Sequence, residues 1–219
     1  VAGTPHEDPA SLDNEYWRGR VWPPLNYLTS GGLRRYGYDE DAAWLAAKGD
    51  ELFRRGWERR RRSWENFNQR TGEGGDSPDA EPFYTWGTLL PLLAEADLLD
   101  LDPIDGLCVG SPAPVVAETT LPTGAWGTLR AVAEPDGVSL HGADGPIFRA
   151  RGARCRFRRV APAEDALSLV LPATVQPIVF EVPWAVAGAT LDGEALVPGA
   201  DGTAVPPGSA GRALRLLRG

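Results

Sequence analysis

The chain has 219 residues, a formal net charge of -8, 42% hydrophobic residues and 24% charged residues. This composition is ordinary for a globular protein and excludes a largely disordered chain. The acidic balance argues against nucleic-acid binding, because phosphate recognition needs a basic surface. The sequence contains no run of about 18 apolar residues, so we also expect no membrane partner.

The two cysteines, Cys108 and Cys155, are too few for a disulfide scaffold or a zinc site. They would pair in a secreted protein, but two buried free thiols are an equally good interpretation. The chain starts on Val1, contains no Met and opens without a signal peptide. It therefore looks like a piece cut from a longer protein, and its location stays open with the cytoplasm slightly favoured.

The chain up to about residue 102 has the hydrophobic spacing of helices. Three helices are predicted, near residues 22–36, 39–61 and 83–98. Pro23 suits a first helical turn, where its missing N–H is not needed, and Asp39 is a good N-cap for the second helix. Trp44 and Trp57 lie within that second helix, and core packing is their expected role. Three helices are too few to close a core of their own size.

A long polar loop separates the second and third predicted helices, between Ser63 and Pro82. Loops of this length are usually functional or disordered. The four arginines at 59–62 just before it are interpreted as the solvated end of a helix, favoured there by the helix dipole. The acids of the loop are interpreted as solvated carboxylates, since they lack the spacing of a calcium loop: Asp76, Asp79 and Glu81.

The pattern changes after residues 103–106, where short alternating segments bounded by turn residues begin. Strands are predicted at residues 127–133, 137–141, 153–160, 166–171, 177–182 and 213–217. Turn sites such as Asp144-Gly145 and Asp192-Gly193 separate several of them, with Gly supplying positive φ. Regular spacing of this kind predicts a small antiparallel β-sandwich, all-β from about residue 107.

Two clusters carry the candidate chemistry. Tyr16, Trp17, Arg18, Gly19 and Trp22 flank the start of the first predicted helix. Aromatic faces beside a guanidinium suit a sugar ring, whose C–H faces stack while its hydroxyls seek hydrogen-bond partners. A purely structural aromatic cluster would have the same sequence pattern, so both interpretations stay open.

In the second cluster, Glu65 lies between aromatic residues and beside two amides, Asn66 and Asn68. A carboxylate in this setting is suited to general-base catalysis, because the amides can position it and a water molecule. The alternative is that Glu65 only caps a helix or pairs with the neighbouring arginines.

The order of these motifs resembles glycoside hydrolase family 63 and the wider clan that includes trehalases. The matching segments are residues 16–22 (YWRGRVW), 65–68 (ENFN), 71–73 (TGE) and 83–86 (FYTW). In the first, Arg20 replaces the usual Pro; in the second, Phe67 replaces Tyr and Gln69 replaces Pro. The family contains glucosidase I, bacterial α-glucosidases, and mannosylglycerate and glucosylglycerate hydrolases. The resemblance covers about residues 14–98.

The resemblance implies roles for individual residues. Glu65 falls on the general base that activates water in an inverting mechanism. The positions expected to contact the substrate are Tyr16, Trp17, Arg18, Gly19, Trp22, Asn66, Asn68 and Trp86. The family's general acid is an Asp far upstream, and no position here matches it. An inverting hydrolase needs both carboxyls, so this chain alone is expected to be inactive.

The helical first half and the strand-patterned second half together predict a fold class of α+β as separate domains. The resemblance implies that residues 1–104 are the last helices of an (α/α)6 barrel, and the strand pattern predicts that residues 105–219 are an accessory β-sandwich. We therefore predict the C-terminal portion of an inverting glycoside hydrolase that acts on a small α-linked glycoside or oligosaccharide. It would need the missing N-terminal half of the barrel, but no cofactor and no metal. The alternatives are a non-catalytic carbohydrate-binding or structural protein and a phosphorolytic relative, in which a water-activating base would be missing.

Overall fold

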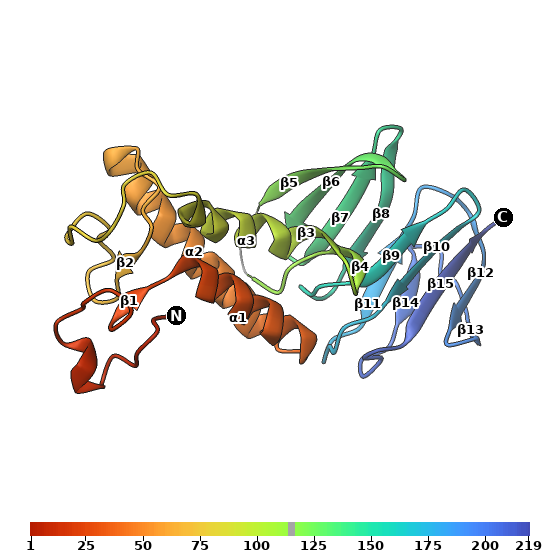
Figure 1. Cartoon of the computed structure of the whole chain (residues 1–219). Coiled ribbons are helices and arrows are strands. Elements are labelled where there is room, and N and C mark those ends of the chain that lie inside the picture. The colour runs from red at the N-terminus through yellow and green to blue at the C-terminus, as the bar shows by residue number, and fades with distance from the viewer. Residues whose placement is uncertain (114–116) are drawn as a thin grey trace. The chain divides into compact units, whose positions relative to one another are not determined.

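The computed structural model describes residues 1–113 and 117–219. They form two compact units, residues 1–95 and 96–219, whose elements are labelled in Figure 1. A domain boundary after residue 104 stays a prediction.

The three helices predicted from the sequence are confirmed. Apart from two short 3-10 turns, the helical elements are α1 (Pro23–Arg35), α2 (Asp39–Arg60) and α3 (Leu89–Leu98). The third starts later than predicted because Thr85–Thr88 form a 3-10 turn before it. Asp39 is not the cap of α2, because Tyr38 occupies that position and Asp39 begins the first turn. Pro23 and Pro24 open α1, as expected of residues without a free N–H.

Helix α2 packs through small residues. Ala42, Ala46 and Gly49 are buried, and a Cβ on Gly49 would lie 3.2 Å from Leu90 Cδ2. This stripe lets neighbouring segments approach the helix backbone closely. Trp44 and Trp57 are 62% and 41% exposed. The expectation that both rings pack in the core is therefore wrong, because the small-residue face, and not the aromatic one, is buried.

The basic run ends α2 as predicted. Arg61 adopts a left-handed conformation (φ 52°) and its N–H donates to the carbonyl of Trp57, which terminates the helix. Arg59 pairs with Glu73 at 2.9 Å, and the Arg62 guanidinium lies 4.3 Å from the centre of the Phe83 ring. These cations remain at the surface, near the negative end of the helix dipole.

Beyond α3 the described residues form strands and turns. A two-stranded sheet joins β3 (Leu99–Asp102) and β4 (Gly106–Val109). The six-stranded sheet has the order β14-β11-β8-β7-β6-β5, with β14 (Thr203–Val205), β11 (Ile178–Glu181), β8 (Gly145–Arg151), β7 (Gly137–Gly142), β6 (Gly127–Glu134) and β5 (Glu118–Thr123). The five-stranded sheet has the order β13-β12-β15-β10-β9, with β13 (Glu194–Leu196), β12 (Val186–Leu191), β15 (Ala213–Arg218), β10 (Ala166–Val170) and β9 (Arg158–Pro162). All pairings are antiparallel.

Alternate residues of these strands form one apolar core. Leu129, Ala131 and Ala133 of β6 are buried, and so are Leu214 and Leu216 of β15. This alternation is the two-residue period of a strand with one buried face. Three buried phenylalanines meet at the centre, with ring centroids 5.3–6.1 Å apart: Phe148, Phe157 and Phe180.

Both cysteines are buried and neither forms a disulfide, so the interpretation as buried thiols is the correct one. Burial is the main cause that raises the pKa of the Cys108 thiol, only partly opposed by the positive charge of Arg156. The neutral thiol is therefore favoured, and Cys108 behaves as a small apolar side chain in the core.

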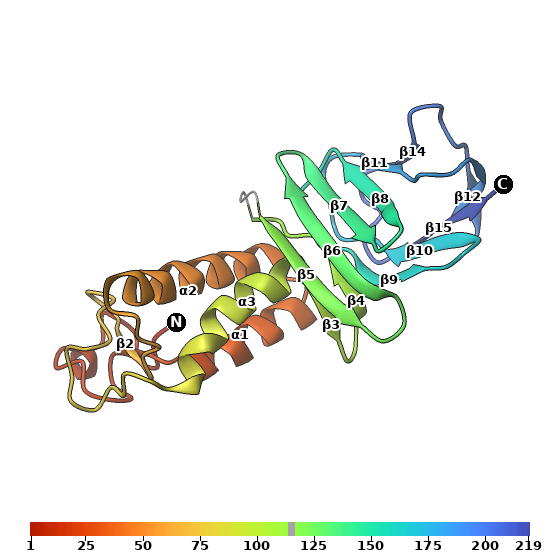
Figure 2. The same cartoon turned by 90° about the horizontal axis from the view of Figure 1, so that it is seen from above.

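The expected fold class is wrong. The described residues contain three α-helices against fifteen strands arranged in four sheets, and the last helices of an (α/α)6 barrel followed by a small β-sandwich are not what they form. The helix prediction rested on local spacing, whereas a barrel needs many helices packed in two rings. In Figure 2 the helices and the segments around them are seen from a second direction. No helix in the described residues is long and apolar enough to cross a bilayer.

The close packing of Gly74 gives a test of residues 1–95. A Cβ at Gly74 would lie inside van der Waals contact with Trp64, which is itself only 8% exposed. We expect Gly74→Ala to destabilise the protein by about 1–3 kcal/mol, the usual cost of overpacking. Chemical denaturation measures this change. The matched control is Gly31→Ala in α1, where nothing lies within 4 Å, and it should leave stability unchanged or raise it by up to about 1 kcal/mol. Equal stability of the two variants would contradict the packing argument.

Candidate functional site

Two short strands bring the sequence motifs together. β1 (Arg20–Val21) pairs antiparallel with β2 (Phe67–Asn68), with Arg20 opposite Asn68 and Val21 opposite Phe67. In this register Trp22 follows directly after the paired residues of β1, and Asn66 directly precedes those of β2. Segments more than 40 residues apart in the sequence therefore lie side by side (Figure 1).

An aromatic cluster forms around Trp22, which is fully buried. The Trp17 ring stacks on it with centroids 3.8 Å apart, and the Tyr16 and Trp86 rings meet it edge-on at 4.9 and 6.5 Å. The Trp22 Nε1–H donates to the carbonyl of Tyr16 at 3.2 Å, which satisfies the buried indole. Tyr16, Trp17 and Trp86 are 40%, 46% and 39% exposed. The cluster thus has a buried centre and three rings that reach solvent.

The turn that carries these rings is conformationally restricted. Asn14 and Tyr16 have positive φ values of 52° and 40°, and Gly19 has φ 88°. A Cβ on Gly19 would lie 2.8 Å from the carbonyl oxygen of Ser11, so only glycine fits. Arg18 lies at the surface, where it pairs with Asp13 and Glu15. In this structure, Gly19 therefore shapes the turn and the guanidinium of Arg18 is bound to acids.

Glu65 is buried, with 7% of its surface exposed. Its backbone N–H donates to the carbonyl of Glu81 at 2.9 Å. Nearby, the Ser63 hydroxyl donates to the carbonyl of Tyr84 at 2.9 Å, and the Tyr84 backbone N–H donates to the carbonyl of Ser63 at 2.8 Å. This pairing holds the Glu65 segment against the segment that leads to Trp86. The Asn66 side-chain N–H donates to the Glu65 carboxylate at 3.5 Å. In the part of the chain that the structure describes, no ion pair joins Glu65 to the basic run at 59–62, so that alternative is not supported.

A buried arginine organises the polar side of the site. Arg20 is 1% exposed, its Nε–H donates to the side-chain oxygen of Asn66, and its guanidinium pairs with Asp76 at 2.9 Å. Asn68 donates to the other Asp76 oxygen at 2.6 Å. Asp76 is exposed, as expected for a loop acid, but it also balances a buried charge, a role that its interpretation as a solvated carboxylate did not include.

Sequence analysis gave Arg20 no role beyond replacing a proline. The signal that could have found it is an arginine inside a motif of otherwise matching residues, with an unassigned aspartate in the loop next to the candidate base.

The network also fixes the Asn66 amide. Because its oxygen accepts from Arg20, its NH2 group must point toward Glu65.

The environment of Asp76 determines its charge. Partial burial acts to raise the pKa of Asp76, but hydrogen bonds from Arg20 and Asn68, with the Arg20 charge, outweigh it and hold that pKa below its ordinary value. Asp76 is therefore ionised at neutral pH. A general acid needs a raised pKa, so Asp76 is unsuited to that role.

Asn68 and the glycines shape the loop around the site. The Asn68 side-chain oxygen accepts from the backbone N–H groups of Arg70 and Thr71 at 2.8 and 3.2 Å. A Cβ on Gly75 would lie 2.7 Å from the Trp64 ring, so the loop lies directly on this indole. Within residues 1–113 and 117–219 no three His, Cys, Asp or Glu side chains cluster as metal ligands would.

Comparison with known proteins finds a match over the residues of this candidate site. Residues 4–87, which contain the aromatic cluster, Arg20, Glu65 and Asp76, match the family model of a glycoside hydrolase domain. That model describes the mannosylglycerate hydrolase MGH1-like glycoside hydrolase domain.

A relative gives the more particular likeness. Over 57 residues the chain is 42% identical to mannosylglycerate hydrolase MGH1 of Selaginella moellendorffii, a stretch that covers 25% of this chain and 12% of that protein. The chain thus spans a small part of the curated relative that it matches. No solved structure matches it significantly. The comparisons support a glycoside hydrolase-like domain, and membership of family 63 is not confirmed.

The pairing of Arg20 with Asp76 predicts a pH dependence. Because the pKa of Asp76 is lower in the folded protein, this carboxylate stabilises the fold fully above about pH 4 and loses that effect as the pH falls through its folded pKa. Asp76→Asn should lower stability at pH 7 by about 1–3 kcal/mol, because a charged hydrogen bond to a buried guanidinium is lost. The stability difference between the wild type and the variant should shrink on acidification. Urea unfolding at pH 7 and pH 3 measures it.

The control is Asp79→Asn, which changes an exposed acid of the same loop. It should alter stability by less than about 0.5 kcal/mol. An Asp76→Asn variant as stable as this control at pH 7 would show that Asp76 does not balance the charge of Arg20.

Proposed function

We propose that residues 4–87 carry the general base and part of the sugar-binding surface of an inverting glycoside hydrolase. The observation that carries the proposal is the placement of a buried carboxylate, Glu65, beside the amide of Asn66. Both residues directly precede β2, which pairs with β1 just before Trp22 of the aromatic cluster. The family match over the same residues supports it.

In this proposal Glu65 accepts a proton from a water molecule as that water attacks the anomeric carbon. The C–O bond to the leaving group breaks on the opposite face, so the configuration inverts. Asn66 holds the carboxylate in one orientation through its N–H. The exposed rings of Tyr16, Trp17 and Trp86 would stack on the sugar, while buried Trp22 supports them.

The leaving group needs a second carboxyl, a general acid roughly 6.5–9.5 Å from the base. Asp76 is unsuited because Arg20 keeps it ionised. We therefore propose that the acid comes from a part of the protein outside these 219 residues, and that this chain alone does not turn over substrate.

The proposed substrate is a small α-linked glycoside or oligosaccharide. The Selaginella relative is a mannosylglycerate hydrolase, and glycosylated glycerate is therefore the first substrate to try; α-glucosides and trehalose-like disaccharides are the next. No proposed step needs a cofactor. Phosphorolysis, in which phosphate replaces the attacking water, is disfavoured by the buried carboxylate of Glu65 at the expected base position.

Non-catalytic sugar binding is the second candidate function. Three partly exposed rings around one buried indole would bind a sugar without any chemistry at Glu65. The two functions differ in what a change at Glu65 does to turnover.

Glu65→Gln separates base catalysis from sugar binding alone. In the protein that contains this chain together with its acid, the variant keeps its shape and hydrogen bonding but cannot accept the proton of water. We expect kcat for hydrolysis of mannosylglycerate or an α-glucoside to fall by about 10²–10⁴-fold. Substrate affinity should stay within about threefold of the wild type, since the stacking rings are unchanged. Steady-state kinetics and equilibrium binding measure the two quantities.

Trp17→Ala is the matched variant on the binding side. It should weaken sugar binding while the Glu65 carboxylate keeps its neighbours. Full activity of Glu65→Gln would reduce Glu65 to a structural residue and leave non-catalytic binding as the better function. Turnover by these 219 residues alone would contradict the proposal that the acid lies elsewhere.

A further inference from the structure

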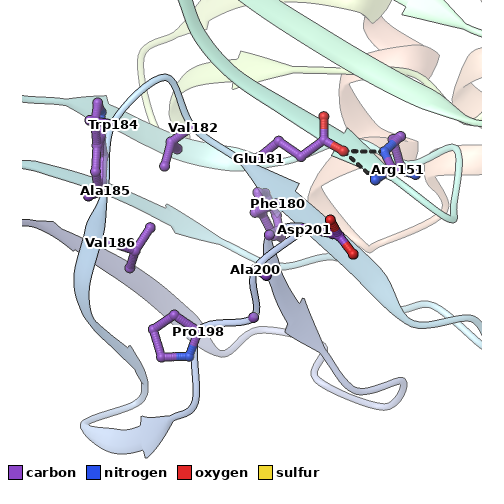
Figure 3. A pocket seen from close by; sticks show the side chains of 12 residues that line it. Arg151, Phe180, Glu181, Val182, Trp184, Ala185, Val186, Pro198, Ala200 and Asp201 are labelled. Atoms are coloured by element: carbon purple, nitrogen blue, oxygen red, sulfur yellow. Dashed lines mark hydrogen bonds and ion pairs between the residues drawn. The ribbon is translucent and has the colours of Figure 1, made fainter.

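A cavity lies within residues 96–219, in a region that the match at 4–87 does not include. Its volume is about 770 Å³, within the size range of small-ligand sites. The segment between β11 and β12 forms one side, and the turn at residues 198–202 forms another (Figure 3). Its walls include Arg151, Glu181, Val182, Trp184, Pro198 and Asp201.

The turn that carries Asp201 is held rigidly. Gly199 and Gly202 exchange backbone hydrogen bonds of 3.0 and 3.3 Å, which closes the loop around the two residues between them. Gly202 has φ 123°, and a Cβ there would lie 2.7 Å from the carbonyl oxygen of Phe180. Only glycine allows this approach to β11. The cavity wall is thus preformed, so a ligand would not have to order it.

The walls combine an aromatic surface with polar groups of both kinds. Trp184 is partly buried against the apolar core and forms an apolar wall with Val182. Figure 3 shows Trp184 on the segment before β12 and Asp201 on the separate turn, with Glu181 and Arg151 at the same cavity. Carboxylates accept hydrogen bonds and a guanidinium donates them. A sugar needs this combination, because its ring presents C–H groups on one face and hydroxyls around the rim.

The charges favour a neutral ligand. The Arg151 Nε–H donates to Glu181 at 2.6 Å, and Glu181 also lies 3.8 Å from a guanidinium nitrogen of Arg149. Arg149 in turn pairs with Glu134. The cations around the cavity are therefore already neutralised, whereas Asp201 adds a negative charge. Arg151 is the one cation among the described residues that line the cavity, and because it is already paired, a phosphate or a carboxylated sugar would be repelled here.

From these observations we infer that the cavity beside Trp184 is a binding site for neutral oligosaccharides. The ring of Trp184 stacks on one sugar unit, and Asp201 and Glu181 accept hydrogen bonds from its hydroxyls. The site is separate from the candidate catalytic residues and does not depend on the role of Glu65. It would hold a glycan chain, and no bond is made or broken in it.

Isothermal titration of the whole chain with maltohexaose, mannohexaose and cellohexaose tests this inference. All titrations use a Trp17→Ala background, which removes a stacking ring of the aromatic cluster in residues 4–87. We expect at least one hexasaccharide to bind, and Trp184→Ala to weaken that binding by about tenfold or more, as loss of a central aromatic anchor does. Asp201→Ala should weaken it by about threefold, as loss of one neutral-to-charged hydrogen bond does in a partly wet site.

Trp126→Ala is the matched control. Trp126 is the other tryptophan of residues 96–219, its Nε1–H donates to the carbonyl of Pro162, and it lies outside the cavity wall. The Trp126→Ala variant should bind the hexasaccharide as tightly as the parent chain does. Trp184→Phe keeps an aromatic face and should retain most of the affinity, which covers the case in which the alanine variant fails to fold.

Three results would overturn the inference. They are no binding of any of the three hexasaccharides, binding that Trp184→Ala and Asp201→Ala leave unchanged, and tighter binding of hexagalacturonate than of the neutral sugars. Failure here would leave the proposal for Glu65 untouched, since that proposal rests on hydrolysis by the protein that contains the acid.

Discussion

The candidate site depends on the neutralisation of one buried guanidinium. A charge removed from water costs several kcal/mol unless opposite charges and hydrogen-bond acceptors surround it. Arg20 meets this requirement with Asp76 and Asn66, both from the loop between the second and third helices. The loop must therefore fold back on the N-terminal turn, and in doing so it places Glu65 next to an amide of fixed orientation. Electrostatic neutralisation and apolar burial therefore act together in this part of the molecule, since Trp64, Phe67, Ala80 and Leu90 form a buried apolar cluster here.

Glycine makes that assembly sterically feasible. Trp64 precedes Glu65 and is enclosed by backbone that comes too close for a side chain at Gly74 and Gly75. A large indole gives the loop an apolar anchor, and the glycines let the chain pass directly over it. The Glu65 segment is thus held by the packing of the neighbouring Trp64 and, through Asn66, by the Arg20 network. If Glu65 is the base, as we propose, such support would help it to act at one water position.

Different interactions stabilise the β-rich residues 96–219. Their core is apolar and their outer charges are neutralised in cross-strand pairs such as Arg130 with Glu118 and Arg149 with Glu134. The cavity in this part is lined by the indole of Trp184 and by Asp201, for which the described residues provide no ion pair.

Local pattern alone determined the helices, the strand-rich second half and the solvated arginine run, because hydrophobic period and turn residues act over a few neighbours. It failed where partners come from far along the chain. Trp44 and Trp57 were expected in the core, but only packing decides which face of a helix is covered. The barrel was expected because the motif resemblance implied it, but helix count and arrangement are tertiary properties that short motifs do not determine. Arg20 and Asp76 lie 56 positions apart, and their pairing became visible only when the fold placed both in a site where an unpaired charge would be too costly.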